Sequence, residues 1–200
     1  MKGGHCYNKY ESTNPIERRM VAGFLRALQD LVRGVGPEIR SITDAGCGEG
    51  YVAKTIAGMN IGPVLAFDAF EDVVGMAART NAASGVTYYT RLLEEARPEV
   101  DGADLVVCLE VLEHLDDPAA AMQRLVSLAR RYLLVSVPRE PIWRLLNMAR
   151  GSYLSSGGNT PGHVNHWSAG GFRHFVSAYA TIVAARHPLP WTMALLRTRS

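Results

Sequence analysis

Two carboxylates stand among three glycines in the run Asp44-Ala45-Gly46-Cys47-Gly48-Glu49-Gly50. A short apolar run precedes it, and a stretch with helical character follows it. Glycines let a chain turn sharply and approach a ligand closely, because they carry no Cβ. A strand, a glycine-rich turn and a helix start are where an open α/β sheet binds a nucleotide-like ligand. Residues 44–50, called the glycine loop below, are therefore predicted to bind such a ligand.

The charges of the glycine loop argue against a dinucleotide. A pyrophosphate favours the positive end of a helix and the spacing G-x-G-x-x-G. Tyr51 stands where the third glycine of that spacing would be, and Asp44 and Glu49 would repel a pyrophosphate. A ligand with a cationic centre and no phosphate suits the loop better, and S-adenosylmethionine (SAM) carries a sulfonium and an ammonium group. A nicotinamide-dependent oxidoreductase is therefore the weaker interpretation.

A third acid, Asp68, closes a second apolar run from Pro63 to Phe67. It follows Gly50 by about 18 residues, and an acid at the end of a second strand can accept hydrogen bonds from ribose hydroxyls. Capping of the next helix is the alternative role. Because the loop and the acid occur together at this separation, we favour the ribose role.

Glu110, Glu113 and His114 come directly after a further apolar run, Leu105 to Leu109. In methyl transfer from a sulfonium, the protein mainly aligns donor and acceptor, but an oxygen nucleophile also has to lose a proton. An imidazole ordinarily changes its charge near neutral pH, so His114 is the leading candidate for the general base, followed by Glu110. The alternative is that His114 caps a turn and that the two glutamates are solvated helix residues.

These segments together resemble the class I SAM-dependent methyltransferases. The glycine loop looks like their first motif, Asp68 matches the second, and residues 103–115 look like the fourth-strand motif. The ending Glu-Val-Leu-Glu-His-Leu is similar to that of the ubiquinone-biosynthesis O-methyltransferases and the broad type 11 group. The resemblance, which covers residues 40 to 140 well, implies SAM as the cofactor. It places at the cofactor Asp44, Ala45, Gly46, Cys47, Gly48, Asp68, Ala69, Leu92, Leu109 and Glu110.

Leu92 departs from the family pattern. Many relatives carry an acid after the third strand that reads the adenine amino group, and Leu92 stands at that place. We therefore expect apolar and backbone contacts to the adenine here.

The pattern Glu110-x-x-Glu113-His114 also allows a metal site. On a helical turn these side chains would share one face, and His163 or His166 could complete the ligand set. Oxygen and nitrogen ligands of this kind suit magnesium, manganese or zinc. The pattern resembles the metal motif of the small-RNA 3′-terminal 2′-O-methyltransferases, and a divalent ion has been proposed for the ubiquinone enzymes. The same Glu-His is common in type 11 enzymes that bind no metal. We therefore expect none, and keep Glu110, Glu113, His114 and His163 as the candidate ligands.

Alternating strand and helix segments predict the scaffold for these residues. We expect an α/β, Rossmann-like methyltransferase fold with a mostly parallel seven-stranded sheet, an antiparallel last strand and helices on both faces. The expected strands lie near residues 39–45, 63–68, 86–90, 105–109, 132–137, 180–186 and 190–198. The expected helices lie near residues 16–32, 49–59, 70–83, 117–130 and 168–179.

The connection at residues 138–167 is too long for simple alternation, and such connections are usually functional. It leaves the carboxyl end of a strand, where ligands bind in α/β sheets, so we interpret it as a substrate cap. We expect His163 or His166 to face the acceptor, with His166 as a catalytic candidate. Apolar residues mixed with arginines would suit a lipophilic acceptor or a membrane surface, although a packed amphipathic helix is the alternative. These residues are Ile142, Trp143, Leu145, Leu146, Met148, Arg139, Arg144 and Arg150.

The chain ends and the composition complete the prediction. Residues 1–200 are expected to form one domain, in which 1–37 are an N-terminal arm and helix. Tyr7 and Tyr10 are candidates to line the cofactor site, and an ordinary mobile terminus is the alternative. The net charge of +2 gives no argument for nucleic acid, and three distant cysteines indicate a reducing, cytoplasmic compartment. No signal peptide or membrane span is expected.

The sequence thus predicts a SAM-dependent methyltransferase acting on a small molecule, at oxygen rather than at nitrogen or carbon. A lipophilic compound or a secondary metabolite is the expected acceptor class. The alternatives are a metal-assisted RNA 2′-O-methyltransferase and a SAM-binding protein without catalysis. The sequence gives neither the acceptor nor the oligomeric state.

Overall fold

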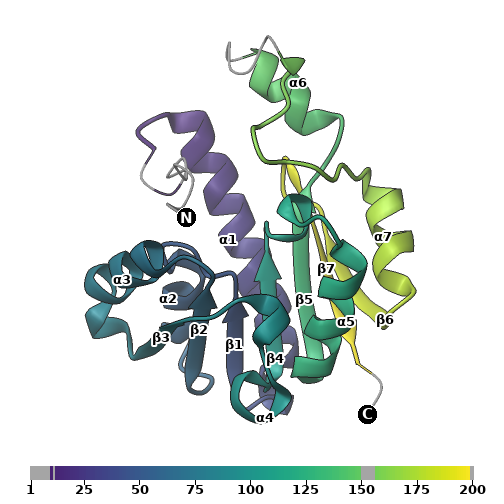
Figure 1. Cartoon of the computed structure of the whole chain (residues 1–200). Helices are drawn as coiled ribbons and strands as arrows, with labels where there is room; N and C mark the ends of the chain where they lie inside the picture. Colours follow the sequence, from purple (N-terminus) through teal and green to yellow (C-terminus); the bar gives the residue numbers. More distant parts are fainter. Residues whose placement is uncertain (1–9, 11, 150–155, 199–200) are drawn as a thin grey trace.

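A seven-stranded sheet forms the centre of the computed structural model, which describes residues 10, 12–149 and 156–198. The strand order is β3-β2-β1-β4-β5-β7-β6 (Figure 1). The first five strands run parallel, and β7 runs antiparallel to both of its neighbours. The strands are β1 (Ile42–Ala45), β2 (Val64–Asp68), β3 (Val86–Thr90), β4 (Ala103–Leu109), β5 (Ala129–Pro138), β6 (Thr181–Arg186) and β7 (Trp191–Arg197).

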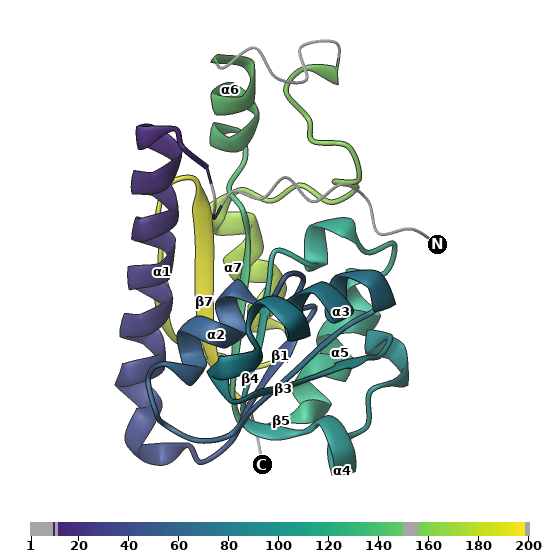
Figure 2. The same ribbon diagram turned by 90° about the vertical axis from the view of Figure 1, so that its left-hand side faces the viewer.

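Helices cover both faces of this sheet (Figures 1 and 2). One buried cluster joins α1 and α2 to the sheet, and a second joins α5 and α7 to its other face. The α-helices are α1 (Pro15–Val35), α2 (Tyr51–Ala57), α3 (Glu71–Thr80), α4 (Pro98–Asp101), α5 (Pro118–Leu128), α6 (Ile142–Ala149) and α7 (Ala169–Ser177). Short 3-10 turns are η2 (Gly36–Glu38), η3 (Ala82–Ser84), η4 (Leu93–Glu95) and η5 (Leu112–His114).

Capping residues explain where the main helices begin. Asn14 accepts a hydrogen bond from the Ile16 N–H and precedes a proline in the first turn of α1. Asp117 and Ser168 cap α5 and α7 in the same way. The apolar face of α1 is buried against the sheet, with Phe24 and Leu28 almost fully enclosed.

The predicted fold class is confirmed, including the antiparallel last strand. The observed bounds of the predicted strands and helices fall within three residues of the expected ones. The sequence did not predict α4, and it gave α6 only as an alternative to a lid. Among the described residues, no helix is both long and apolar enough to cross a membrane.

The two ends of the connection between β5 and α7 lie side by side. Arg139 forms an isolated parallel bridge with Trp167, and the Glu140 N–H donates to the Trp167 carbonyl at 2.9 Å. Between these points α6 stands beyond the carboxyl ends of the parallel strands in both views (Figures 1 and 2). Residues 138–167, called the cap segment below, include 150–155, which lie outside the described part.

Candidate active site

The glycine loop is a tight turn tied to the end of β2. The N–H groups of Gly46 and Cys47 donate to the Phe67 carbonyl at 2.8 and 2.9 Å. Gly46 has φ +78°, and a Cβ there would lie 2.5 Å from the Val111 Cγ2 atom. Only glycine therefore allows the loop to approach the segment after β4 so closely.

Asp68 connects the glycine loop to the start of α3. Its Oδ2 atom accepts from the Gly48 N–H at 2.9 Å, and its Oδ1 atom accepts from the Phe70 N–H at 3.2 Å. The N-cap position of α3 belongs to Phe70 and carries no side-chain cap. Asp68 is thus held at the carboxyl edge of the sheet beside the glycine loop, where the ribose role was predicted.

Asp44 is a buried carboxylate behind the glycine loop, only 2% exposed. Burial raises its pKa to about 7, the nearby charge of Asp68 acts in the same direction, and a hydrogen bond from the Ala53 N–H opposes both. Among the described residues, its Oδ2 atom has no hydrogen-bond partner. A cationic ligand near this carboxylate would favour its ionised form.

The other residues predicted to hold the cofactor lie around the same edge. Ala45, Cys47 and Leu109 are buried, whereas Ala69 and Leu92 are exposed. The thiol of Cys47 faces the Gly48 carbonyl, and burial raises the pKa of this thiol well above its usual value. The N–H of Arg91, next to Leu92, donates to the Asp68 carbonyl, so the turns after β2 and β3 are linked.

The segment after β4 differs from the helical turn that the metal hypothesis assumed. Glu110 adopts a left-handed conformation with φ +58°, and its N–H donates to the Ser136 carbonyl. The 3-10 turn η5 begins only at Leu112. Glu110 therefore does not share a helical face with Glu113 and His114, and it is absent from the cluster of candidate ligands among the described residues.

His114 lies at the centre of the catalytic candidates, with an exposed ring. Its Nδ1 atom is 3.0 Å from the Gly162 carbonyl oxygen, which can only accept. The proton of the neutral ring is therefore on Nδ1, and Nε2 carries the lone pair. This is the tautomer that a general base needs.

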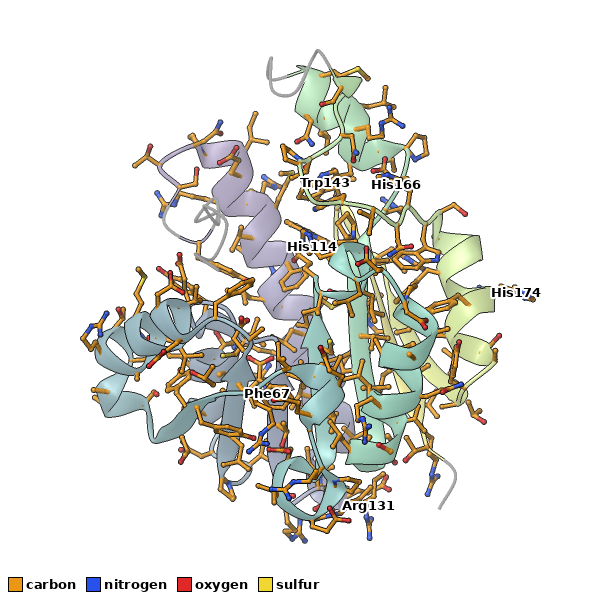
Figure 3. The ribbon with its side chains drawn as sticks, in the orientation of Figure 1. Phe67, His114, Arg131, Trp143, His166 and His174 are labelled. Carbon is orange, nitrogen blue, oxygen red and sulfur yellow. The ribbon has the colours of Figure 1, made fainter. Side chains whose placement is uncertain are left out.

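The structure brings His163, rather than His166, to His114. The two rings pack edge to face with their centroids 4.8 Å apart, and His163 also stacks on Trp143. His166 instead points its Nδ1 atom at Glu140 Oε1, 3.6 Å away, at the base of the cap segment. Figure 3 shows Trp143 and His166 beyond His114, on the cap side.

Side-chain donors fold the cap segment onto itself and onto η5. The Trp143 indole donates to Thr160 Oγ1, and the buried Asn147 amide donates to the Gly158 carbonyl at 2.8 Å. The Asn165 amide donates to the Leu115 carbonyl at 2.6 Å. Sequence reasoning missed Asn147 and Asn165. The only signal for Asn147 was a polar residue on the apolar side of α6.

The packed-helix alternative describes the inner side of α6, and the lid interpretation stays a prediction. Trp143 packs against Trp191 in the core, as the packed-helix alternative predicted. Leu145 is 56% exposed and faces outward. Arg150 lies outside the described residues.

At the other side of the glycine loop, Tyr10 stacks on Tyr51 with ring centroids 4.5 Å apart. Tyr51 replaces the third glycine of the dinucleotide spacing, so an aromatic pair borders the loop there. Tyr7 lies outside the described residues.

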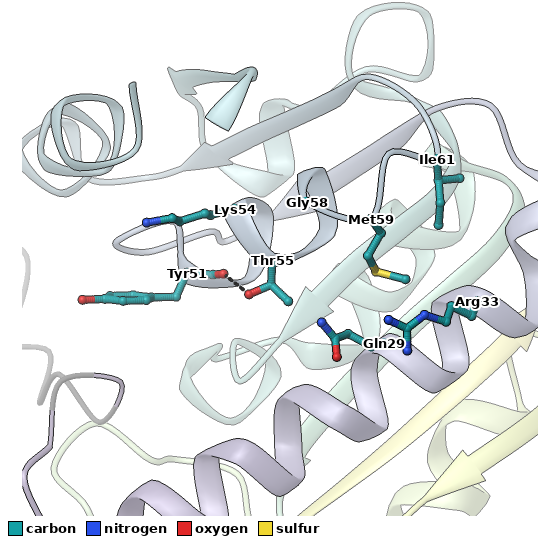
Figure 4. A pocket seen from close by; sticks show the side chains of 8 residues that line it. All are labelled: Gln29, Arg33, Tyr51, Lys54, Thr55, Gly58, Met59 and Ile61. Carbon is teal, nitrogen blue, oxygen red and sulfur yellow. Dashed lines mark hydrogen bonds between the residues drawn. The ribbon is translucent and has the colours of Figure 1, made fainter. Parts of the chain in front are cut away.

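A groove of about 650 Å³ lies between α1 and α2 (Figure 4). It includes Tyr51 but none of the loop glycines, Asp68 or His114. It is therefore a surface groove beside the glycine loop and separate from the candidate site. It is lined by Gln29, Arg33, Tyr51, Lys54, Thr55, Gly58, Met59 and Ile61.

The sequence model of a protein family described as a methyltransferase domain matches residues 16–179. The chain belongs to this family. The predicted class I methyltransferase is thereby confirmed at the level of family, and the nicotinamide-dependent alternative is wrong.

The chain has relatives among the ubiquinone biosynthesis O-methyltransferases. It is 28% identical over 150 residues to a ubiquinone biosynthesis O-methyltransferase of Methylococcus capsulatus, covering 66% of this chain and 62% of the relative. The chain thus spans less than two thirds of that relative's length.

Two solved structures show the same fold at low sequence identity. Magnesium protoporphyrin IX methyltransferase from Synechocystis PCC 6803, with bound S-adenosylhomocysteine, has a TM-score of 0.70 at 20% identity, over 94% of this chain and 89% of that one. The N-methyltransferase NodS from Bradyrhizobium japonicum has a TM-score of 0.65 at 16% identity, over 94% and 99%.

Proposed function

We propose that this protein transfers the methyl group of SAM to an oxygen nucleophile on a small, lipophilic or secondary-metabolite acceptor. The family and the acid-bearing glycine loop support SAM. The contact of 3.0 Å between His114 Nδ1 and the Gly162 carbonyl, which leaves Nε2 to accept a proton, is the observation that supports an oxygen acceptor. An amine that arrives unprotonated needs no base before the transfer, whereas a hydroxyl has to lose its proton.

The residues of the loop fit a cationic cofactor. Asp44 is buried beside the loop with one carboxylate oxygen that has no partner among the described residues, and Asp68 adds a second acid at the same edge. When bound, SAM supplies a methyl group that is already activated by its sulfonium. Asp68 would hold the ribose, and the charge of Asp44 would favour the positive end of the cofactor.

His114 would take the proton of the acceptor. As the acceptor oxygen forms its bond to the methyl carbon, the bond from that carbon to sulfur breaks and the hydroxyl proton passes to Nε2 of His114. The Gly162 carbonyl stabilises the resulting imidazolium through Nδ1. The cap segment would exclude water and align the acceptor with the methyl group.

The experiment that tests this function measures S-adenosylhomocysteine formation with a panel of acceptors. Phenols, aliphatic alcohols and amines of matched size are compared, each with short and long alkyl substituents. Phenols with apolar substituents are expected to turn over fastest. SAM and S-adenosylhomocysteine should both raise the melting temperature, and NAD should not. Stabilisation without turnover of any acceptor would favour the alternative of a SAM-binding protein without catalysis.

A metal-assisted RNA 2′-O-methyltransferase is a second candidate, favoured by one observation. Ligand atoms of Glu113, His114 and His163 lie within 4.8 Å of one another. Two ligands at about 2.1 Å on opposite sides of an ion would be about 4.2 Å apart, so a small movement of the rings would fit a divalent cation. Such an ion would polarise an acceptor oxygen.

Chelation distinguishes the two candidates. If a metal is needed, treatment with EDTA abolishes methyl transfer, magnesium, manganese or zinc restores it, and a short RNA ending in a free 2′-hydroxyl becomes methylated. The small-molecule proposal expects activity that is indifferent to EDTA and no methylated RNA.

We also propose that lipophilic acceptors are reached at the outer side of the cap segment. Leu145 and Val164 of the cap segment are each 56% exposed, and Arg144 precedes Leu145 in α6. Cosedimentation with anionic phospholipid vesicles tests a peripheral membrane contact. Replacement of Leu145 by Ser should reduce any vesicle binding.

A further inference from the structure

Two side chains from the edge of the sheet reach the last residues of the glycine loop. Asn81 closes α3, and Tyr88 lies in the middle of the edge strand β3. The Asn81 amide donates a hydrogen bond of 3.1 Å to the Glu49 carbonyl. The Tyr88 hydroxyl donates one of 3.4 Å to the Gly50 carbonyl. Both contacts therefore come from outside the loop and from distant parts of the chain.

These contacts converge on Gly50, the residue from which α2 starts. Gly50 has φ +80° and gives α2 no side-chain cap. A Cβ on Gly50 would lie 2.6 Å from the Tyr88 hydroxyl oxygen and 2.9 Å from the Asn81 amide nitrogen. The absence of a side chain at Gly50 thus lets both donors reach the backbone, in addition to permitting the left-handed conformation.

Both donors are suited to a permanent contact. Asn81 is 5% exposed, and a buried amide is costly unless it is hydrogen-bonded. Burial raises the pKa of Tyr88 to about 12, so its hydroxyl keeps its proton at neutral pH. Tyr88 also packs against the core on the α1 and α2 side of the sheet, which fixes its ring.

Fixing two successive carbonyls fixes two successive peptide planes, because each peptide unit is planar. The opposite side of the same loop is held by Asp68, which accepts from the Gly48 N–H. Hydrogen bonds therefore hold the turn on both sides. A site that already has its binding conformation loses less conformational entropy when the ligand binds.

We propose that Asn81 and Tyr88 are positioning residues for SAM, which set the conformation of the glycine loop from its outer side. They act through the carbonyls of Glu49 and Gly50. This inference rests on the proposed function in one respect, namely that SAM occupies the glycine loop. It adds two residues outside the sequence motif to those that determine cofactor affinity.

The test compares Tyr88→Phe and Asn81→Ala with a matched control, Tyr89→Phe. Tyr89 is the neighbouring half-buried tyrosine of β3, and its hydroxyl donates to Asp101 Oδ1 instead of to the glycine loop. Titration calorimetry gives the Kd for S-adenosylhomocysteine, and thermal unfolding gives the stability. Amide resonances of Gly48 and Gly50 in a ¹⁵N-labelled sample report the loop conformation.

Loss of one neutral hydrogen bond is expected to raise the Kd about fivefold in Tyr88→Phe and in Asn81→Ala. The Gly48 and Gly50 resonances should move in both variants. Tyr89→Phe should lower the melting temperature by a similar amount while the Kd and both resonances stay at their wild-type values.

A wild-type Kd and unmoved glycine resonances in Tyr88→Phe would overturn the proposal and leave a purely structural role. Because this variant keeps the ring and its packing, it decides the matter even if Asn81→Ala does not fold. Failure of the wild-type protein to bind S-adenosylhomocysteine is a different result, and it would contradict the proposed function itself.

Discussion

The glycine loop and the cap segment both lie at the carboxyl edge of the parallel strands, but different kinds of hydrogen bond hold them in place. The loop follows from backbone bonds to β2 and from glycines that adopt positive φ. The cap segment depends on side-chain donors such as Trp143 and Asn147, which bind a hydroxyl and a carbonyl more than ten residues away. The turn of the loop follows from its own glycines, and Asn81 and Tyr88 then support it from elsewhere in the chain. The cap segment has no such local pattern and depends on distant partners.

The two regions also differ in charge. The loop side carries the carboxylates Asp44 and Asp68, which suit a cationic cofactor. The cap side meets η5 through the rings of His114, His163 and Trp143. Electrostatic changes should therefore act on cofactor binding when made at the loop, and on proton transfer when made where the cap meets η5.

Replacement of His114 by Gln should have the largest effect. Glutamine fills similar space but cannot take a proton, so kcat for a hydroxyl acceptor should fall by about a thousandfold. The Kd for SAM should change little, because the glycine loop is untouched. Single-turnover methyl transfer and calorimetry separate the two quantities.

His174→Gln is the control for this change, since His174 lies on α7 and points outward at the right-hand edge of the molecule, away from His114 (Figure 3). It should keep the wild-type kcat. A larger loss in His163→Gln than in His114→Gln would show that His163, and not His114, is the base.

Asp44→Asn tests the loop side through pH. Because the folded protein raises the pKa of Asp44 to about 7, the folded state binds more protons than the unfolded state between about pH 4 and 7. The carboxylate therefore lowers stability progressively as the pH rises through this window, by up to about 4 kcal/mol. The variant should be more stable than the wild type at pH 8 and similar at pH 4, as measured by urea unfolding.

The same variant should bind SAM more weakly at pH 8, because the charge that attracts the cofactor is gone. Stability and affinity thus move in opposite directions. Equal stability of the two proteins at pH 8 would show that Asp44 is not destabilised by burial.

Gly46→Ala and Gly48→Ala separate close approach from backbone conformation. Both glycines have positive φ, but only at Gly46 would the new methyl group meet another side chain, that of Val111. Left-handed backbone costs an alanine about 1 kcal/mol, and overpacking adds about 2 kcal/mol. In urea unfolding, the free energy of unfolding should therefore fall by about 3 kcal/mol in Gly46→Ala and by about 1 kcal/mol in Gly48→Ala. Equal losses would contradict the predicted clash with Val111.

The loop side could largely be predicted from the sequence, and the cap side could not. The glycines, Asp44 and Asp68 lie in short runs next to apolar strands, so their type and spacing define the turn. Nothing in such a run indicates that Glu110 is left-handed or that η5 starts only at Leu112. Whether His163 or His166 lies against His114 depends on how residues 156–167 pack near the end of β4. Long-range hydrogen bonds determine that packing.

Asn147→Leu should have the smallest effect and bears on the cap side alone. The buried amide holds Gly158 and Thr160, and this stretch leads to Gly162, whose carbonyl receives the His114 Nδ1–H. Leucine keeps the volume but leaves the Gly158 carbonyl without this donor, at a cost of about 1–2 kcal/mol. Gly162 would then be held less firmly, and its carbonyl would orient the His114 ring less well. We therefore expect kcat to fall by about threefold to tenfold, with the Kd for SAM unchanged. The matched change Leu145→Asn on the exposed side of α6 should alter neither quantity when the acceptor carries a short alkyl substituent and needs no membrane contact. An increased Kd for SAM in Asn147→Leu would mean that the two sides of the site are coupled, and that their separation into a cofactor side and a proton-transfer side is wrong.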